Sequence, residues 1–249
     1  MKKILIYILL LFIALGNLKA AHILIPMDRS QSNHLKAYGI AYFVLANEVE
    51  VSWLLNYRGG SFMFAHHKTF EDELIIRGVS YQVIADVQAA AILNEIAGED
   101  VNMDEMKLHK VPKIAVYTPR NKQPWDDAVT LVLTYAEIPF DKIYDEEIIA
   151  GSLPLYDWLH LHHEDFTGQY GKFWANYQHA LWYVEDVRTS EEIANKLGYS
   201  KVSLLKLDVA KRIRDFVAGG GFLFAMCSAP ESLDIALAAE GIDICQAMF

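Results

Sequence analysis

Short apolar segments alternate with amphipathic segments along most of this chain, and this alternation constrains its fold more than any other feature. The apolar runs predict strands at residues 22–28, 51–56, 81–85, 113–118, 140–144, 156–162 and 221–226. The amphipathic segments predict helices at residues 35–46, 71–77, 86–97, 203–217 and 231–239, and a further helix that opens at Pro124. Strands that alternate with helices favour the α/β class, with parallel sheets covered by helices on both faces.

Two α/β units are expected. Residues 99–112 are mostly polar and predict a linker between an N-terminal unit at residues 21–98 and a second unit at residues 113–249. Residues 166–199 are an aromatic-rich insertion between a strand of the second unit and its crossover helix. Because residues 241–249 are apolar and have no closing helix, we expect the second unit to be incomplete at its C-terminal end.

The first twenty residues have the layout of a secretory signal peptide. Lys2 and Lys3 precede an apolar run at residues 4–15, and the segment ends in the small residue Ala20. The apolar run is shorter than the roughly 20 residues that a membrane-spanning helix needs. We therefore expect cleavage before Ala21, a periplasmic or secreted mature protein, and no stable membrane insertion after cleavage.

Charge and cysteine content exclude some classes of protein. The net charge is −10, and it becomes −13 when Lys2, Lys3 and Lys19 leave with the signal peptide. A surface that acidic repels phosphate backbones, so we expect no nucleic-acid partner. The two cysteines, Cys227 and Cys245, are too few for a disulfide framework, although a single bridge between them fits the sequence.

The predicted strand at residues 221–226 runs into Cys227 and Ser228, and a helix follows. A strand, a tight turn and a helix lift a nucleophile above the carboxyl ends of the strands. The adjoining helix N-terminus favours a thiolate and can bind an oxyanion. Cys227 is therefore the candidate nucleophile, with Ser228 as a substrate contact. The alternative is a buried structural cysteine, which is common in protein cores.

Histidines and carboxylates gather where the predicted strand at residues 156–162 ends. Ligands of parallel sheets bind at the carboxyl ends of the strands, so His163 and Glu164 are candidate acid–base residues. We expect polar substrate contacts from His160, His162, Asp165 and Gln169, and a weaker one from Arg58 of the N-terminal unit. A divalent metal at His160, His162, His163, Glu164 and Asp165 is an alternative, but no established metal-binding spacing is present, so we expect no cofactor.

The insertion carries six aromatic residues that admit two interpretations. They are Tyr170, Phe173, Trp174, Tyr177, Trp182 and Tyr183. The residues either stack on a glycan-like or small-molecule ligand, or form the small core of a lid. The first interpretation predicts a binding protein and the second a covered active site.

The segment from Lys113 onward resembles the class I glutamine amidotransferase-like fold, a flavodoxin-like arrangement. The residues that carry this resemblance are Lys113-Ile-Ala-Val-Tyr117, the following helix and the turn at Cys227. The resemblance covers a little over half of the chain and is more specific for fold than for reaction. Members with a full catalytic triad add a histidine and an acidic residue after a later strand, which here corresponds to positions beyond Phe249.

The whole chain is similar to a family of exported Bacteroidetes proteins that often carry the label asparagine synthetase B. The motifs are Leu24-Ile-Pro-Met-Asp28, His34-Leu-Lys-Ala-Tyr-Gly39, Leu54-Leu-Asn-Tyr-Arg-Gly-Gly-Ser61, Pro124-Trp-Asp-Asp-Ala128, His160-Leu-His-His-Glu-Asp-Phe-Thr-Gly-Gln-Tyr-Gly171 and Gly219-Gly-Gly-Phe-Leu-Phe-Ala-Met-Cys-Ser-Ala229. That label implies an N-terminal catalytic cysteine, but this chain starts with Met1, or with Ala21 after cleavage. The Ser-Gly-Gly-x-Asp-Ser loop that adenylates aspartate is also missing, so we do not expect ATP-dependent asparagine synthesis.

Taken together, the residues predict an exported amidotransferase-like protein that hydrolyses an amide or ester through Cys227, with help from His163 or Glu164. The alternative is a non-catalytic protein that binds a glycan or another small molecule on the same fold. A metal-dependent hydrolase is the third interpretation.

Overall fold

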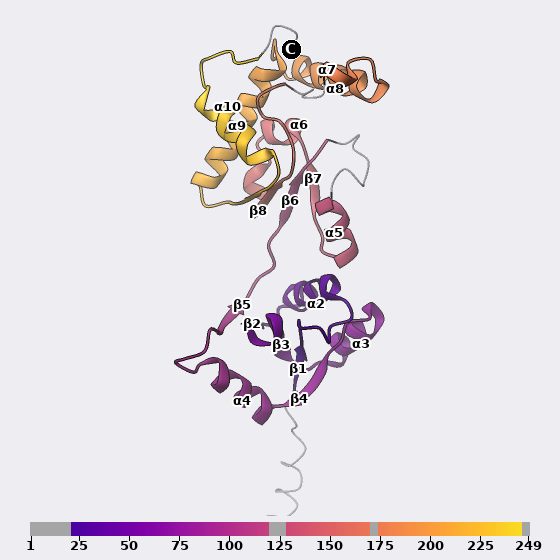
Figure 1. The fold of residues 1–249 in the computed structure, drawn as a ribbon, viewed down its shortest axis with the longest axis vertical. Coiled ribbons are helices and arrows are strands. Elements are labelled where there is room, and N and C mark those ends of the chain that lie inside the picture. The colour runs from indigo at the N-terminus through magenta and orange to yellow at the C-terminus, as the bar shows by residue number, and fades with distance from the viewer. Residues whose placement is uncertain (1–20, 120–127, 170–173, 246–249) are drawn as a thin grey trace, which may run out of the picture. The chain divides into compact units, whose positions relative to one another are not determined.

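The computed structural model describes residues 21–119, 128–169 and 174–245 (Figure 1). The chain divides into two compact units, one made of Met1–Val111 with Tyr135–Ile138 and the other of Pro112–Thr134 with Pro139–Phe249. The predicted signal peptide and the start of the helix predicted to open at Pro124 lie outside the described residues, and the described part of that helix is α5 (Ala128–Ala136). Within the described ranges, no helix combines the length and the apolar character that a membrane span requires.

The first unit contains a five-stranded antiparallel sheet. Its strands are β1 (Ala21–Ile25), β2 (Val51–Leu55), β3 (Ser61–Ala65), β4 (Gln82–Ala85) and β5 (Asp104–Leu108). They lie in the order β4-β1-β3-β2-β5, and every neighbouring pair is antiparallel. The prediction of a parallel sheet was therefore wrong for this unit.

A tight turn at Tyr57–Gly59 explains the antiparallel arrangement, because it returns the chain directly from β2 into β3. Arg58 and Gly59 have left-handed φ values of +46° and +84°. A Cβ atom on Gly59 would lie 2.5 Å from the carbonyl oxygen of Met27, so the turn leaves no room for a side chain there. Strand β5 lies within residues 99–112, where we expected a linker, and pairs with β2.

Helices cover both faces of this antiparallel sheet. Helices α2 (His34–Ala46) and α3 (Lys68–Arg77) pack on one face, where Ile23, Ile25 and Phe62 are buried. Helix α4 (Asp86–Ile96) packs on the other face, against Leu24 and Met63. Successive β1 residues enter opposite cores because side chains alternate along a strand.

The second unit contains a four-stranded sheet, and here the predicted parallel arrangement is confirmed. Its strands are β6 (Ile114–Tyr117), β7 (Asp141–Ile143), β8 (Trp158–Leu161) and β9 (Phe222–Ala225). They lie in the order β7-β6-β8-β9, and all three pairings are parallel. Strand β7 lies on one side of β6, and β8, the next strand in the chain, lies on the other side of β6. The strand order therefore reverses between β6 and β8, and the carboxyl ends of these two strands flank that point.

Six α-helices follow β6 along the described chain (Figure 1). They are α5 (Ala128–Ala136), α6 (Asp145–Ile149), α7 (Trp174–Tyr177), α8 (Leu181–Lys196), α9 (Val202–Ala218) and α10 (Ala229–Ala238). The largest core joins Leu159 and Leu161 of β8 to Leu205 and Val209 of α9 and to Leu233 of α10. This core anchors both ends of the turn between β9 and α10.

Candidate functional site

Cys227 lies in the turn between β9 and α10 in a left-handed backbone conformation. Its φ angle is +59°, and the residue is exposed. A residue other than glycine adopts this conformation at a cost of about 1–3 kcal/mol, and such strained residues cluster at functional sites. A strand, a left-handed residue and a helix follow one another here. The same order occurs in the sharp turns that carry the nucleophile of many α/β hydrolases.

Backbone hydrogen bonds hold the turn against the segment that follows β8. The strand register pairs Leu161 with Ala225, and the Met226 N–H donates to the Leu161 carbonyl at 3.1 Å. Two residues further on, the Ser228 hydroxyl donates to the carbonyl of His163 at 3.1 Å. The hydroxyl of Ser228, the residue that follows Cys227, therefore contacts the backbone of His163.

The imidazoles of His162 and His163 contact each other directly. Their Nδ1 atoms are 3.0 Å apart, and their ring centroids are 4.5 Å apart with planes inclined by 70°. A neutral imidazole carries a proton on one ring nitrogen and a lone pair on the other. One Nδ1 must therefore donate and the other accept, so the tautomers of the two rings are complementary.

Glu164 holds the loop that carries the two histidines. Its side chain is buried, and Oε2 accepts a hydrogen bond from the His162 N–H at 3.3 Å. Its carbonyl accepts from the Ser232 hydroxyl on α10 at 2.8 Å. The carboxylate that we predicted to be catalytic is thus turned toward its own loop.

Other predicted substrate contacts have partners within this unit. The Asp165 carboxylate accepts from the Thr167 backbone N–H at 2.9 Å and from the Thr167 hydroxyl at 2.6 Å. The Gln169 side-chain amide donates to the Ile244 carbonyl at 3.5 Å. His160 is buried in β8 with its ring stacked on Phe224 at 5.5 Å. Asp165 and Gln169 therefore contribute to loop structure, and His160 lies inside the sheet.

Arg58, the remaining predicted contact, belongs to the first unit. Its Nε donates to the Asp28 carboxylate at 2.7 Å, and a terminal nitrogen donates to the Ser30 hydroxyl at 3.1 Å. The hydrogen bond from Arg58 holds the pKa of Asp28 well below its ordinary value. This pair braces the β2–β3 turn.

The histidines and carboxylates of the site do not converge on one point. Among the residues that the structure describes, no three His, Cys, Asp or Glu side chains are grouped so as to hold a metal ion. The Nδ1 atoms of His162 and His163 face each other, and the carboxylates of Glu164 and Asp165 bind backbone N–H groups.

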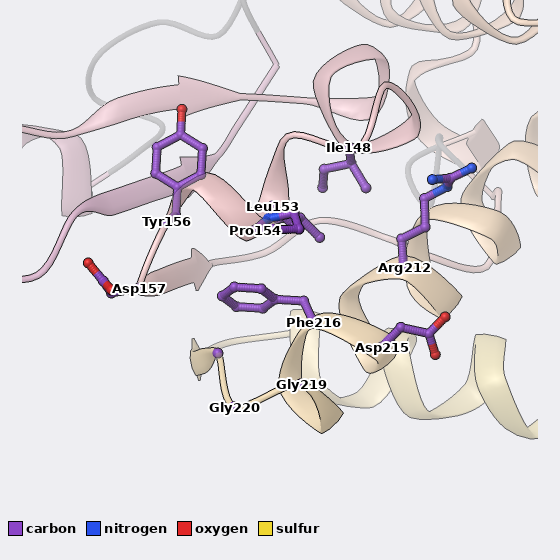
Figure 2. Close-up of a pocket in the computed structure, with 12 residues that line it drawn as sticks. Ile148, Leu153, Pro154, Tyr156, Asp157, Arg212, Asp215, Phe216, Gly219 and Gly220 are labelled. Atoms are coloured by element: carbon purple, nitrogen blue, oxygen red, sulfur yellow. The ribbon is translucent and has the colours of Figure 1, made fainter.

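A pocket of about 540 Å³ lies at the opposite edge of the same sheet (Figure 2). Its lining includes Asp157 and Gly221, which immediately precede β8 and β9, and the Phe216 ring and Arg212 of α9. Because parallel sheets bind their ligands at the carboxyl ends of the strands, the edge with Cys227 remains the candidate site.

A second pocket of about 430 Å³ adjoins the loop after β8. Phe166 and Thr167 line it together with residues 241–245. The Cys245 thiol donates to the Thr167 carbonyl at 2.9 Å, and burial raises the pKa of this thiol. Cys245 is thus the less accessible of the two free thiols.

A buried polar cluster beside the site was missed in the sequence. The Lys206 ammonium of α9 lies 2.7 Å from the Asp145 carboxylate, 2.8 Å from the Tyr117 hydroxyl and 3.1 Å from the Tyr144 hydroxyl. Both members of the ion pair are almost fully buried. Burial alone would lower the pKa of Lys206, but the charges and hydrogen bonds of Asp145 and Tyr144 together outweigh it and raise that pKa. The signal was present, because Lys206 falls at helical spacing among buried apolar residues of α9.

The insertion exposes several of its aromatic residues. Trp174, Tyr177 and Trp182 are exposed, and the rings of Tyr177 and Trp182 lie 5.5 Å apart. Tyr183 is buried. Tyr170 and Phe173 lie outside the described residues. Of these four described rings, one is therefore buried and three are exposed.

Comparison with known proteins gives no match for this chain. No protein-family model matches it, and neither a curated protein nor a solved structure does. The site is therefore interpreted from its own residues and their geometry.

Proposed function

We propose that this protein is a hydrolase that cleaves an amide or ester bond through Cys227. The observation that carries this proposal is the left-handed conformation of an exposed cysteine, with φ of +59°, at a turn between a parallel strand and a helix. A buried structural cysteine needs neither the exposure nor the strain. In this proposal His163, whose carbonyl accepts a hydrogen bond from Ser228, supplies the base.

The reaction proceeds in two halves. His163 takes the proton of the Cys227 thiol, the sulfur attacks the carbonyl carbon, and the C–O double bond opens to an oxyanion. When the carbonyl re-forms, the bond to the leaving amine or alkoxide breaks, and the protonated His163 returns its proton to that group. Water then attacks the thioester with His163 as base, which releases the acid and restores the thiol.

The N-terminus of α10 supports both charged species of this scheme. Helix α10 has ten residues and begins at Ala229, two residues after the nucleophile. The partial positive charge at a helix N-terminus favours a thiolate and an oxyanion near it. The turn therefore supplies electrostatic stabilisation where negative charge develops.

His163 suits the role of base better than Glu164. The Glu164 carboxylate is buried and accepts a hydrogen bond from its own loop, so proton transfer by this group would disturb the loop. His163 is half-buried, and its carbonyl accepts a hydrogen bond from the hydroxyl of Ser228, the residue after Cys227. Imidazole is also the side chain whose ordinary pKa is nearest to neutral pH.

A non-catalytic binding protein is the second candidate function. The exposed rings of Trp174, Tyr177 and Trp182 support it, because exposed aromatic residues stack on sugars and other flat ligands. In a binding protein, ligand affinity depends on these rings and does not depend on the Cys227 thiol. The two candidates therefore separate cleanly by mutation.

The test compares hydrolysis by the mature chain with that of single variants on a panel of amides and activated esters. We expect Cys227→Ser and His163→Gln to lose more than about 100-fold in kcat/KM, and Cys245→Ser to stay within about twofold. Trp182→Ala is the matched variant for the binding function. Full activity in Cys227→Ser, or glycan binding that only Trp182→Ala abolishes, would reject the hydrolase.

A further inference from the structure

We propose that His162 is a positioning residue that fixes the tautomer of His163, so that the two histidines and Cys227 act as one relay. The inference rests on the proposed hydrolase function and deepens it. In this relay an imidazole occupies the place that a carboxylate takes in many hydrolases.

The Nδ1 atoms of His162 and His163 lie 3.0 Å apart, within hydrogen-bond distance. To act as a base through Nε2, neutral His163 must keep its proton on Nδ1. That proton is then donated to the Nδ1 lone pair of His162, which in turn must carry its own proton on Nε2. The opposite arrangement would put a proton on Nε2 of His163 and remove its ability to accept one from a thiol.

The two carboxylates that follow His163 in the sequence accept hydrogen bonds from the loop. Glu164 accepts from the His162 N–H, and Asp165 accepts from the N–H and hydroxyl of Thr167. The ring of His162 is the group that the structure places in hydrogen-bond contact with Nδ1 of His163. The orienting function therefore falls to His162.

The backbone of His162 is held from both sides. Its carbonyl accepts from the Ala229 N–H at 3.3 Å, and its N–H donates to Glu164 at 3.3 Å. The ring centroid lies 6.4 Å from that of His160, which is fixed within the sheet. A side chain supported in this way can orient a neighbour without a large loss of entropy at each turnover.

The hydrogen bond from His163 to His162 is expected to activate the Cys227 thiol only moderately. When His163 accepts the thiol proton it becomes a cation, and the neutral His162 ring stabilises it through one hydrogen bond. A carboxylate in that place would add the attraction between its negative charge and the cation. His162 therefore contributes chiefly by excluding the unproductive tautomer of His163.

The first experiment measures alkylation of Cys227 by iodoacetamide in the full mature chain, with mass spectrometry as readout. We expect His162→Leu to slow the reaction by about 10-fold or more, because Leu cannot accept the Nδ1 proton of His163. We expect His162→Asn to stay within about threefold of the wild type, since its side-chain oxygen can take the place of Nδ1. Equal rates in the Leu and Asn variants would overturn the proposal.

Cys245 reports the integrity of the loop in the same samples. Its thiol binds the Thr167 carbonyl, so a loop that loosens in His162→Leu would expose Cys245 and speed its alkylation. We expect an unchanged Cys245 rate. A loss of Cys227 reactivity together with faster Cys245 alkylation would mean that His162 is only structural.

The second experiment observes the tautomers directly. In long-range ¹H–¹⁵N spectra of the mature chain, assigned with His162→Asn and His163→Gln, protonated and unprotonated ring nitrogens have distinct ¹⁵N shifts. We expect the Nδ1–H form for neutral His163 and the Nε2–H form for His162. The reverse assignment would overturn the inference while leaving the hydrolase proposal standing. A wild-type Cys227 that is inert to iodoacetamide would instead reject the hydrolase itself.

Discussion

The backbone strain at Cys227 is the single-residue feature that supports the proposed function. A left-handed cysteine costs free energy that a glycine would not, and a chain keeps such a residue where its side chain is needed. The stability of the protein and its reactivity therefore make opposite demands on this position.

Replacing Cys227 tests this conflict. We expect Cys227→Gly to be more stable to unfolding than Cys227→Ala by about 1 kcal/mol, because only glycine relieves the positive φ. Urea unfolding of the two variants gives the difference. A Gly variant that is less stable than the Ala variant would show that the left-handed conformation stores no strain.

The buried ion pair of Lys206 and Asp145 yields a second prediction at this scale. We expect Lys206→Met to destabilise the second unit by about 3–5 kcal/mol, because it leaves an uncompensated buried carboxylate. Lys196→Met is the matched control, since Lys196 pairs with the neighbouring Glu146 but is 71% exposed. We expect less than about 1 kcal/mol for the control in urea unfolding. If the two variants lose similar amounts of unfolding free energy, burial of the Lys206–Asp145 pair is not what makes it important for stability.

The same cluster predicts how stability depends on pH. Burial and the charge of Asp145 raise the pKa of Tyr117, and the pKa of Lys206 is raised as well. The folded chain keeps both protons at pH values where the unfolded chain, with ordinary values of 10.0 and 10.5, has lost them. The stabilisation is therefore complete below about pH 10 and is lost as the pH rises further.

Unfolding midpoints measured between pH 8 and about 11.5 check this dependence. We expect the unfolding midpoint of the wild type to decrease as the pH rises above about 10. The midpoint of Tyr117→Phe should decrease less steeply, because one titrating group is gone. A wild-type stability that rises above pH 10, or the same slope in both proteins, would show that the linkage is wrong.

At the scale of elements, the loop between β8 and α7 depends on one crowded glycine. Gly168 has φ of +82°, and a Cβ there would lie 2.3 Å from the Cα of Ser203. Gly198 has nearly the same φ, +86°, but a Cβ at that position would meet nothing within 4 Å. A comparison of alanine substitutions at the two glycines therefore distinguishes the cost of backbone strain, which both share, from the cost of steric crowding, which only Gly168 has.

We expect Gly198→Ala to cost about 1–2 kcal/mol through strain alone. Gly168→Ala should cost at least twice as much and should also slow Cys227 alkylation, because the displaced backbone carries the two histidines. Urea unfolding and iodoacetamide labelling measure the two effects. Equal costs at both glycines would mean that the loop moves away from Ser203 without consequence.

Sequence patterns predicted the elements better than their pairing. The strand that ends before Cys227 and the helix after it follow from apolar periodicity, and so does the buried stripe of α9. The direction of the strands in the first unit did not follow, because periodicity is the same in parallel and antiparallel sheets. The paired glycines after β2 were the decisive signal for a hairpin, but the strand beyond them, Ser61–Ala65, was not recognised.

The candidate site shows the same limit. A cysteine at a strand end and a cluster of histidines are visible in the sequence, so Cys227 and His163 could be named as candidates. The contact between His162 and His163, and the loop-bracing role of Glu164, depend on χ angles that residue spacing does not determine. Lys206 was overlooked because its partner, Asp145, lies 61 residues away in the chain.

At the scale of the whole molecule, the two units have separate cores. The buried residues around α2 and β3 share no member with those around α9 and β8. We expect Val44→Ala, in the core of the first unit, to cost about 2 kcal/mol in that unit. Hydrogen exchange should show the loss between residues 21 and 111, while Cys227 alkylation stays within about twofold. A large drop in Cys227 reactivity would contradict the independence of the cores.

The central claim is that Cys227 is an activated nucleophile, and its alkylation rate in the native chain tests that claim most directly. The reference is the same thiol in the urea-unfolded chain, which removes the effect of exposure. We predict that native Cys227 reacts with iodoacetamide at least about 10-fold faster than the unfolded reference, and that His163→Gln removes most of this advantage. A native rate at or below that of the unfolded chain, or a rate unchanged in His163→Gln, would contradict the account.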